Sequence, residues 1–219
     1  MLNNCITGRT VAHLDEASLA SYREFVRMAN PALKAVDAAD EVFCEHTGIC
    51  RNRELTYAGL LFLGKADVLR MYVNNFWIDY VEMGAGKPSS VLFRLSELGN
   101  IWNAYQAVMS RLFVHPDCSD PRRWAILREG LVNCLSYADY FAPMHPVVRL
   151  FPDRISFRNP GRLSASAPVF IHHLFVHCGL AGNARAGLSL IRSWEEVAGK
   201  KVSIDTNHFY TELTFFRGL

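Results

Sequence analysis

The chain has 219 residues, of which 50% are hydrophobic and 20% are charged, a composition that excludes wholesale disorder. At about 100–200 residues per domain, this length accommodates one large domain or two small ones. The formal net charge of +2 is too small for a protein that wraps duplex DNA by charge alone. Residues 1–120 carry 11 Lys/Arg against 14 Asp/Glu, whereas residues 121–219 carry 12 against 7, so the charge changes sign along the chain.

A polar stretch over residues 115–121 coincides with this change of sign and predicts two units, residues 1–118 and 119–219. In the first unit we expect, in chain order, helices over residues 15–28 and 37–47, an apolar block over 56–64, a strand over 70–83 and a helix over 95–113.

The second unit opens with a helix that starts at Pro121, because Asp120 can cap it and proline fits a first helical turn. After it we expect strands over residues 147–151 and 155–157, a turn over 159–161, helices over 168–178 and 184–198, and a hairpin over 201–204 and 209–216. This order predicts an α/β (α+β) fold, in which a sandwich with helices on one face of a mixed sheet follows a smaller α/β connector.

The cysteines and the first residues of the chain indicate its compartment. Six cysteines are scattered without a CxxC pair, and residues 1–19 lack the apolar core of a signal peptide. Apolar runs stay well below the ~18 residues that span a bilayer. We therefore expect a cytoplasmic protein with free thiols and no membrane partner.

Glu129 and Asn133 stand four residues apart on the predicted helix, so they project from one face, opposite the apolar stripe that begins at Trp124. A carboxylate and an amide placed together can bind hydrated Mg²⁺ and orient a water molecule. The competing interpretation is an exposed polar face without function, which spacing alone favours.

Residues 127–140, LREGLVNCLSYADY, resemble the segment REALVNALVHRDY of transcriptional regulators with a Schlafen AlbA-type domain, which are also labelled RecG-related ATP-dependent DNA helicases. Three further segments resemble this family in the same order: residues 55–65 resemble the family's LTNAGLLLFGK, residues 153–163 its DRIEISNPGGL, and residues 172–192 its AELFRLLGLIEEWGSGIPRI. Helicase activity is not supported, because the chain lacks GxxxxGK[ST]. Family members usually carry an AlbA-type domain upstream, so contact with DNA is expected only through domains absent from this chain.

In that family the second unit is similar to the GHKL (Bergerat-type) ATPase fold, and the resemblance implies individual roles. Glu129 would be the general base, and Asn133 would bind Mg²⁺ through ATP or ADP. Asn159 and Gly161 would contact adenine, with Asn159 where these ATPases usually carry an aspartate. Asp139, the aspartate of the family's HRDY segment, is placed among the nucleotide-binding residues.

Gly187 would end the phosphate-proximal glycine motif, where a glycine lets the backbone approach phosphate oxygens. The family's GSG reads Arg185-Ala186-Gly187 here, so Arg185 either clamps a phosphate or fills its space. The segment HRDY has lost its histidine and arginine at residues 137 and 138, and RNP reads Ser-Ala-Pro at residues 166–168. These departures indicate weakened or lost nucleotide binding.

Other candidates are weaker. His173 and His177 have a spacing that can bind zinc, yet no second ligand pair follows, so no zinc is expected.

Three hypotheses remain for the whole chain. The first is a regulator module that binds ATP or ADP with Mg²⁺. The second is a degenerate GHKL fold kept for dimerisation or protein contacts, which predicts an occluded cavity. The third is a slow Mg²⁺-dependent ATPase.

Overall fold

The computed structural model describes residues 2–85, 90–96, 99–115, 119–162, 170–182 and 184–217, with the side chains of residues 184–186 outside that description. Its α-helices are α1 (Glu16–Ala29), α2 (Asp40–Thr47), α3 (Tyr57–Leu63), α4 (Ala66–Tyr72), α5 (Ile101–Phe113), α6 (Pro121–Ser136), α7 (Phe170–His177), α8 (Ala184–Arg192) and α9 (Trp194–Ala198). Its 3₁₀ helices and strands are η1 (Val11–His13), η2 (Lys34–Asp37), β1 (Cys50–Arg51), β2 (Glu54–Leu55), β3 (Asp79–Met83), β4 (Val91–Leu95), β5 (Val147–Leu150), β6 (Arg154–Pro160), β7 (Val202–Thr206) and β8 (Tyr210–Phe216).

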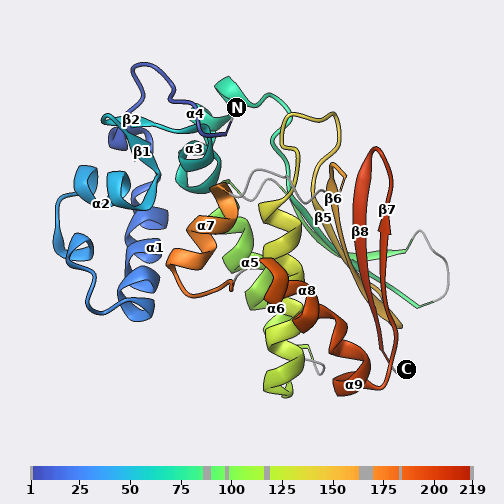
Figure 1. Cartoon of the computed structure of the whole chain (residues 1–219). Helices are drawn as coiled ribbons and strands as arrows, with labels where there is room; N and C mark the ends of the chain where they lie inside the picture. The colour runs from blue at the N-terminus through green and yellow to red at the C-terminus, as the bar shows by residue number, and fades with distance from the viewer. Residues whose placement is uncertain are drawn as a thin grey trace.

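A six-stranded sheet in the order β4-β3-β5-β6-β8-β7 forms one layer of the molecule. The β3–β5 ladder is parallel and the other ladders are antiparallel, so the sheet is mixed. Helices α6, α8 and α9 lie against one face of it, and α1 and α2 lie on the far side of the helical layer from the sheet (Figure 1). The predicted fold class, helices on one face of a mixed sheet, is confirmed.

The sheet crosses the predicted boundary at residue 119. Strands β3 and β4 precede that residue, yet β3 pairs with β5, where Tyr80 lies opposite Val148. Buried hydrophobic residues from both sides of residue 119 belong to one continuous core. The two units expected from the sequence therefore share one sheet and one core.

Aspartate caps begin the two longest helices, and the cap at Asp120 was predicted from the sequence. Asp15 accepts a hydrogen bond from the Ser18 amide at 2.8 Å, and Asp120 accepts one from the Arg122 amide at 2.8 Å, with Pro121 in the first turn. Each cap satisfies an amide that has no partner inside its helix. The C-terminal hairpin also forms where it was expected, as β7 and β8.

Three predicted elements are wrong in part. The expected strand over residues 70–83 is a helix end followed by a strand, because Val68 and Leu69 pack α4 into the core and only residues 79–83 join the sheet. The expected turn at residues 159–160 is instead the end of β6. The expected single helix over residues 184–198 is divided at Ser193, whose hydroxyl donates to the Leu190 carbonyl at 2.6 Å.

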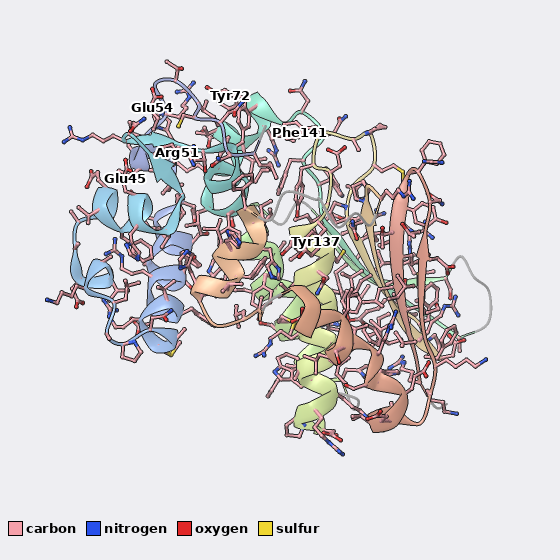
Figure 2. All side chains as sticks on the ribbon, viewed as in Figure 1. Glu45, Arg51, Glu54, Tyr72, Tyr137 and Phe141 are labelled. Atoms are coloured by element: carbon pink, nitrogen blue, oxygen red, sulfur yellow. The ribbon has the colours of Figure 1, made fainter. Side chains whose placement is uncertain are left out.

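Helix α6 occupies the centre of the fold and contacts α5, α7, α8, α9 and β6. Gly130 permits its close approach to the sheet, because a Cβ there would lie 2.9 Å from Phe215 Cε2 and 3.3 Å from Phe157 Cδ2. Phe141 lies beyond the end of α6 (Figure 2). Its ring packs edge-to-face on Tyr57 at 5.9 Å between ring centroids and so ties the loop to α3. Within the described residues, no helix combines the length and the hydropathy that a membrane span requires.

Candidate functional site

Glu129 is buried in the protein and its helical neighbour Asn133 is half-buried. Glu129 is only 4% exposed, and its Oε1 accepts a hydrogen bond of 2.8 Å from Asn133 Nδ2. The same amide nitrogen also donates to the Glu129 backbone carbonyl at 2.8 Å. The interpretation of this face as an exposed polar surface is therefore wrong, because α6 is covered on this side as well as on its apolar side. A buried carboxylate requires such a hydrogen-bond partner.

Helix α8 provides the cover. Gly187 is buried against Glu129, and a Cβ added to it would lie 3.1 Å from Glu129 Cδ and closer still to Oε1. Only a glycine permits this approach of the α8 backbone to the carboxylate. The resemblance places Gly187 beside phosphate, and here the same residue contacts the expected general base. The Arg185 side chain and residues 166–168 lie outside the described residues.

On the sheet side, Asn159 ends β6 and is 6% exposed. Its Nδ2 donates to the Tyr137 carbonyl at 3.3 Å and to the Pro160 carbonyl at 3.2 Å, so the amide joins the end of α6 to the sheet. Gly161 follows with φ of +98°, a conformation that favours glycine. Asp139 donates its backbone amide to the Pro160 carbonyl at 2.9 Å, which holds this turn against α6.

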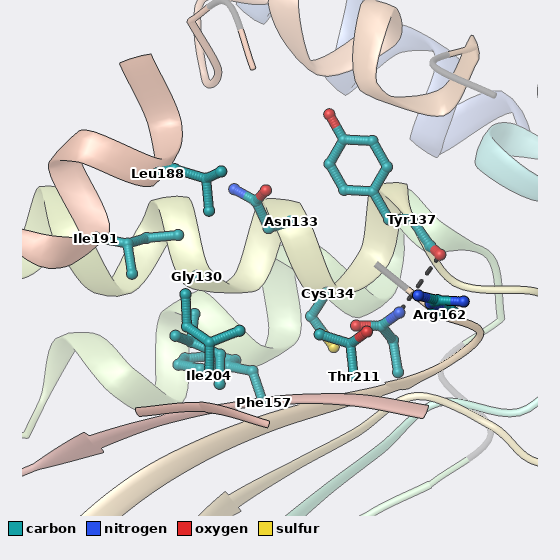
Figure 3. Close-up of a pocket in the computed structure, with 12 residues that line it drawn as sticks. Gly130, Asn133, Cys134, Tyr137, Phe157, Arg162, Leu188, Ile191, Ile204 and Thr211 are labelled. Carbon is teal, nitrogen blue, oxygen red and sulfur yellow. Dashed lines mark hydrogen bonds between the residues drawn. The ribbon is translucent and has the colours of Figure 1, made fainter. Parts of the chain in front are cut away.

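Asn133 and Asn159 face a common cavity between α6, α8 and the sheet (Figure 3). Its volume is about 40 Å³, against the roughly 300–1,000 Å³ of ordinary small-molecule sites. The residues that line it are Gly130, Asn133, Cys134, Tyr137, Phe157, Asn159, Arg162, Leu188, Ile191, Ile204, Thr211 and Leu213. Because the cavity is too small for an adenine nucleotide and α8 covers Glu129, the residues present do not fit ATP with Mg²⁺ in this arrangement.

The sequence-predicted site is therefore brought together only in part. Glu129, Asn133 and Gly187 are in contact, and Asn159 lies across the cavity with Gly161 after it. Asp139 is exposed, and its carboxylate accepts a hydrogen bond from the Phe141 amide at 3.0 Å, so it stabilises its own turn rather than lining the cavity.

Several cavity residues were missed from the sequence. Thr211 on β8 donates its hydroxyl to the Gly161 carbonyl at 3.1 Å, and Leu188 on α8 closes the cavity from the opposite side. Arg162 stands at the edge of the cavity and is exposed. The only signal for Thr211 was its position on the inward face of the predicted hairpin, which it shares with Leu213.

Burial controls the chemistry of the titratable groups beside this cavity. It raises the pKa of the Tyr137 phenol, and the nearby Glu129 carboxylate raises it further. Burial also raises the pKa of the Cys134 thiol, which therefore stays protonated and unreactive at neutral pH. The Tyr137 ring stacks on His172 at 5.6 Å between centroids, and His172 Nε2 is 3.0 Å from the Gly182 carbonyl oxygen. This stacking fixes the end of α6 against α7.

His173 and His177, whose spacing could bind zinc, both lie on α7. In the part of the chain that the structure describes, no three His, Cys, Asp or Glu side chains are grouped so that they could hold a metal ion. The His46 and His177 rings approach each other at 6.4 Å between centroids, as neighbours on packed helices.

Comparisons with known proteins support the fold rather than an activity. A family model described as a domain of unknown function, DUF8451, matches residues 3–79. The crystal structure of the DIP2311 protein from Corynebacterium diphtheriae superposes with a TM-score of 0.79 at 18% sequence identity, over 99% of this chain and 46% of that one. No curated protein matches the chain. The chain thus spans somewhat less than half the length of the solved structure it resembles, and at this identity the likeness shows that the two share a fold.

Proposed function

We propose that this chain is an interaction module built on a GHKL-like sandwich whose nucleotide position is closed, and that it contributes contacts rather than ATP hydrolysis to a transcriptional regulator of the cytoplasm. The observation that carries the proposal is the close packing of Gly187 against the buried Glu129 carboxylate. A general base must reach a water molecule, and a metal-bound phosphate needs open space beside Asn133. Helix α8 covers Glu129, and the cavity beside Asn133 has a volume of only about 40 Å³.

Opening the site would separate α8 from α6 over an apolar contact. Ile191 is 1% exposed, and Leu188 lines the same cavity. Leu188 is already 36% exposed, so moving the helix would newly expose mainly Ile191 and would leave Glu129 without its cover. The hydrophobic effect opposes that movement, since burying such a side chain contributes about 1.5–3 kcal/mol. The closed arrangement is therefore the stable one without a ligand.

Edge strand β4 supplies a contact surface for such a module. It pairs with β3 on one side and with no other described strand on its outer side. Its first two residues are apolar and exposed, Val91 by 52% and Leu92 by 72%. An unpaired apolar edge is a template for strand addition, and two copies can meet there about a two-fold axis. The proposed partner is therefore a second copy of this chain.

Sedimentation velocity at tens of micromolar protein tests this contact. We expect a dimer for the wild type and a monomer for Leu92→Arg, because the added charge would be buried at the edge-to-edge contact. Val42→Arg is the matched control, since Val42 is 54% exposed on α2, away from the sheet. A wild type that sediments as a monomer, or a Leu92→Arg variant that remains dimeric, would overturn the proposed contact.

ATP turnover separates the interaction module from a slow ATPase. With Mg²⁺ present, we expect phosphate release by the wild type to equal that of Glu129→Gln, because Glu129 cannot reach a water molecule from beneath α8. Steady turnover that disappears in Glu129→Gln would instead establish the ATPase hypothesis.

Nucleotide binding is a second candidate function, and one observation favours it. Polar groups from α6, β6 and β8 converge on the same cavity, namely Asn133, Asn159 and Thr211. If α8 moves to admit a nucleotide, Leu188→Ala should ease that movement and tighten ADP binding, while Asn159→Ala should abolish it. If neither variant changes the heat of an ADP titration, this candidate fails.

A further inference from the structure

A second cavity lies on the other side of α6 and shares no lining residue with the first. It has a volume of about 330 Å³, within the usual range of small-molecule sites. Helices α1, α5 and α6 and the segment after α7 surround it, through Phe25, Tyr105, Gln106, Met109, Ser110, Trp124, Arg128 and Leu180.

Arg128 is the only charged side chain on this wall among the described residues. Its Nε is buried and has no hydrogen-bond partner, and the guanidinium forms no ion pair with any described residue. By contrast, Arg111 on the neighbouring helix α5 reaches the Glu82 carboxylate at 2.5 Å. A partly buried cation without a counter-charge is costly, and an anion that entered the cavity would remove that cost.

The charge of Arg128 acts inside this cavity. Burial raises the pKa of the Tyr105 phenol, and the nearby guanidinium opposes that rise. It also opposes the rise that burial causes in the pKa of Cys178. The guanidinium is therefore near enough to both side chains to act on them electrostatically.

Three of the lining residues are aromatic, and their neighbours hold the rings in place. Phe25 meets Trp102 edge-to-face at 5.1 Å between ring centroids. Tyr105 stacks on Trp102 at 5.6 Å between ring centroids, with an interplanar angle of 21°. Trp124 meets Phe113 edge-to-face at 5.4 Å. The three rings are thus positioned before any ligand arrives, which reduces the entropic cost of binding.

We propose that this cavity binds a small aromatic carboxylate, with the acid on the Arg128 guanidinium and the ring among Phe25, Tyr105 and Trp124. The planar guanidinium can donate two parallel hydrogen bonds to a carboxylate, a geometry that a lysine cannot reproduce. Aromatic side chains at this spacing accept a flat ring by offset or edge-to-face contact. This site is independent of the Glu129–Asn133 cavity and of the proposed interaction function.

Calorimetric titration with indole-3-acetate tests the proposal, and indole-3-ethanol is the neutral probe of matched shape. We expect saturable binding of the acid and affinity for the alcohol lower by roughly tenfold or more, because only the acid pairs with Arg128. Arg128→Met should weaken binding of the acid by a similar factor. Arg162→Met is the matched control, because Arg162 lines the other cavity, and it should leave the affinity unchanged.

Thermal melting of Arg128→Met distinguishes a loss of ligand binding from a loss of folding. Since Arg128 has no partner to lose among the described residues, Arg128→Met should melt at or above the wild-type temperature. A melting temperature lower by several degrees would assign Arg128 a structural role and overturn the proposal. Equal affinities for acid and alcohol would overturn it too, as would the absence of saturable heat with indole-3-acetate, 4-hydroxyphenylacetate and benzoate alike.

Discussion

Replacing Gly187 with alanine perturbs the candidate site at a single atom. The new Cβ would lie 3.1 Å from Glu129 Cδ and closer to Oε1, so the carboxylate must move or α8 must lift. Glu129 is 4% exposed and held by Asn133 at 2.8 Å, which leaves it little room. Either adjustment disrupts the contact that closes the site.

The magnitude follows from three contributions. Overpacking a well-filled interior costs about 1–3 kcal/mol. Losing the hydrogen bond to a buried carboxylate costs about 1–3 kcal/mol more if Glu129 swings away. Alanine in place of glycine inside a helix returns about 1 kcal/mol. With both costs, the net expectation is a destabilisation of about 1–5 kcal/mol, or a fall in melting temperature of roughly 2–20 °C for a chain of this size.

Urea denaturation of a double-mutant cycle isolates the contact. In a Glu129→Ala background the clash is gone, while Asn133 keeps its hydrogen bond to the backbone carbonyl of residue 129. Adding Gly187→Ala there should be neutral or stabilising by up to about 1 kcal/mol. If Gly187→Ala destabilises both backgrounds equally, the two residues are not coupled and the closure of the site by α8 is refuted.

Three further predictions concern stability. Gly59→Ala should lower the free energy of unfolding, measured by urea denaturation, by about 3 kcal/mol. The new Cβ would lie 2.9 Å from the carbonyl carbon and Cα of Ile49, and backbone cannot give way as a side chain can. A variant as stable as the wild type would contradict this packing. Burial alone would raise the pKa of Asp79, but hydrogen bonds led by that from Arg94 hold it below its ordinary value, so this carboxylate stabilises the fold above an ordinary aspartate pKa and ceases to do so in acid. Asp79→Asn should therefore cost about 2–3 kcal/mol at pH 7 and flatten the loss of stability in acid, as chemical denaturation at several pH values would reveal. Burial and two neighbouring histidines lower the pKa of His177. The stability linked to its neutral form is therefore present above the ordinary histidine pKa of about 6.5 and is lost as pH falls through the lowered value. His177→Asn should reduce the slope of melting temperature against pH in that interval, and an unchanged slope would refute this linkage.

Local signals in the sequence predict much of the fold. Asp120 followed by Pro121 determines where α6 begins, and alternating residues place the β7–β8 hairpin, because capping and strand alternation act over a few residues. Strand β4 was missed, since its apolar residues face outward at a sheet edge and do not alternate in burial. Its pairing with β3 depends on tertiary contacts rather than on a local pattern.

The candidate site shows the same limit. The spacing of Glu129 and Asn133 placed both on one helical face, and their hydrogen bond bears that out. The burial of Glu129 could not be predicted, because it depends on Gly187, which lies far along the chain on another helix. The isolation of Arg128 is equally invisible in the sequence, since it depends on which carboxylates the fold brings near.

Calorimetric titration of Mg²⁺-ATP into the wild-type chain tests the central claim most directly, namely that α8 closes the position beside Glu129 and Asn133. The closed arrangement predicts no saturable heat and no difference between the wild type and Asn133→Ala. Saturable binding with a stoichiometry of one that is lost in Asn133→Ala would contradict it, because such a ligand could bind only where the α8 backbone now contacts the carboxylate.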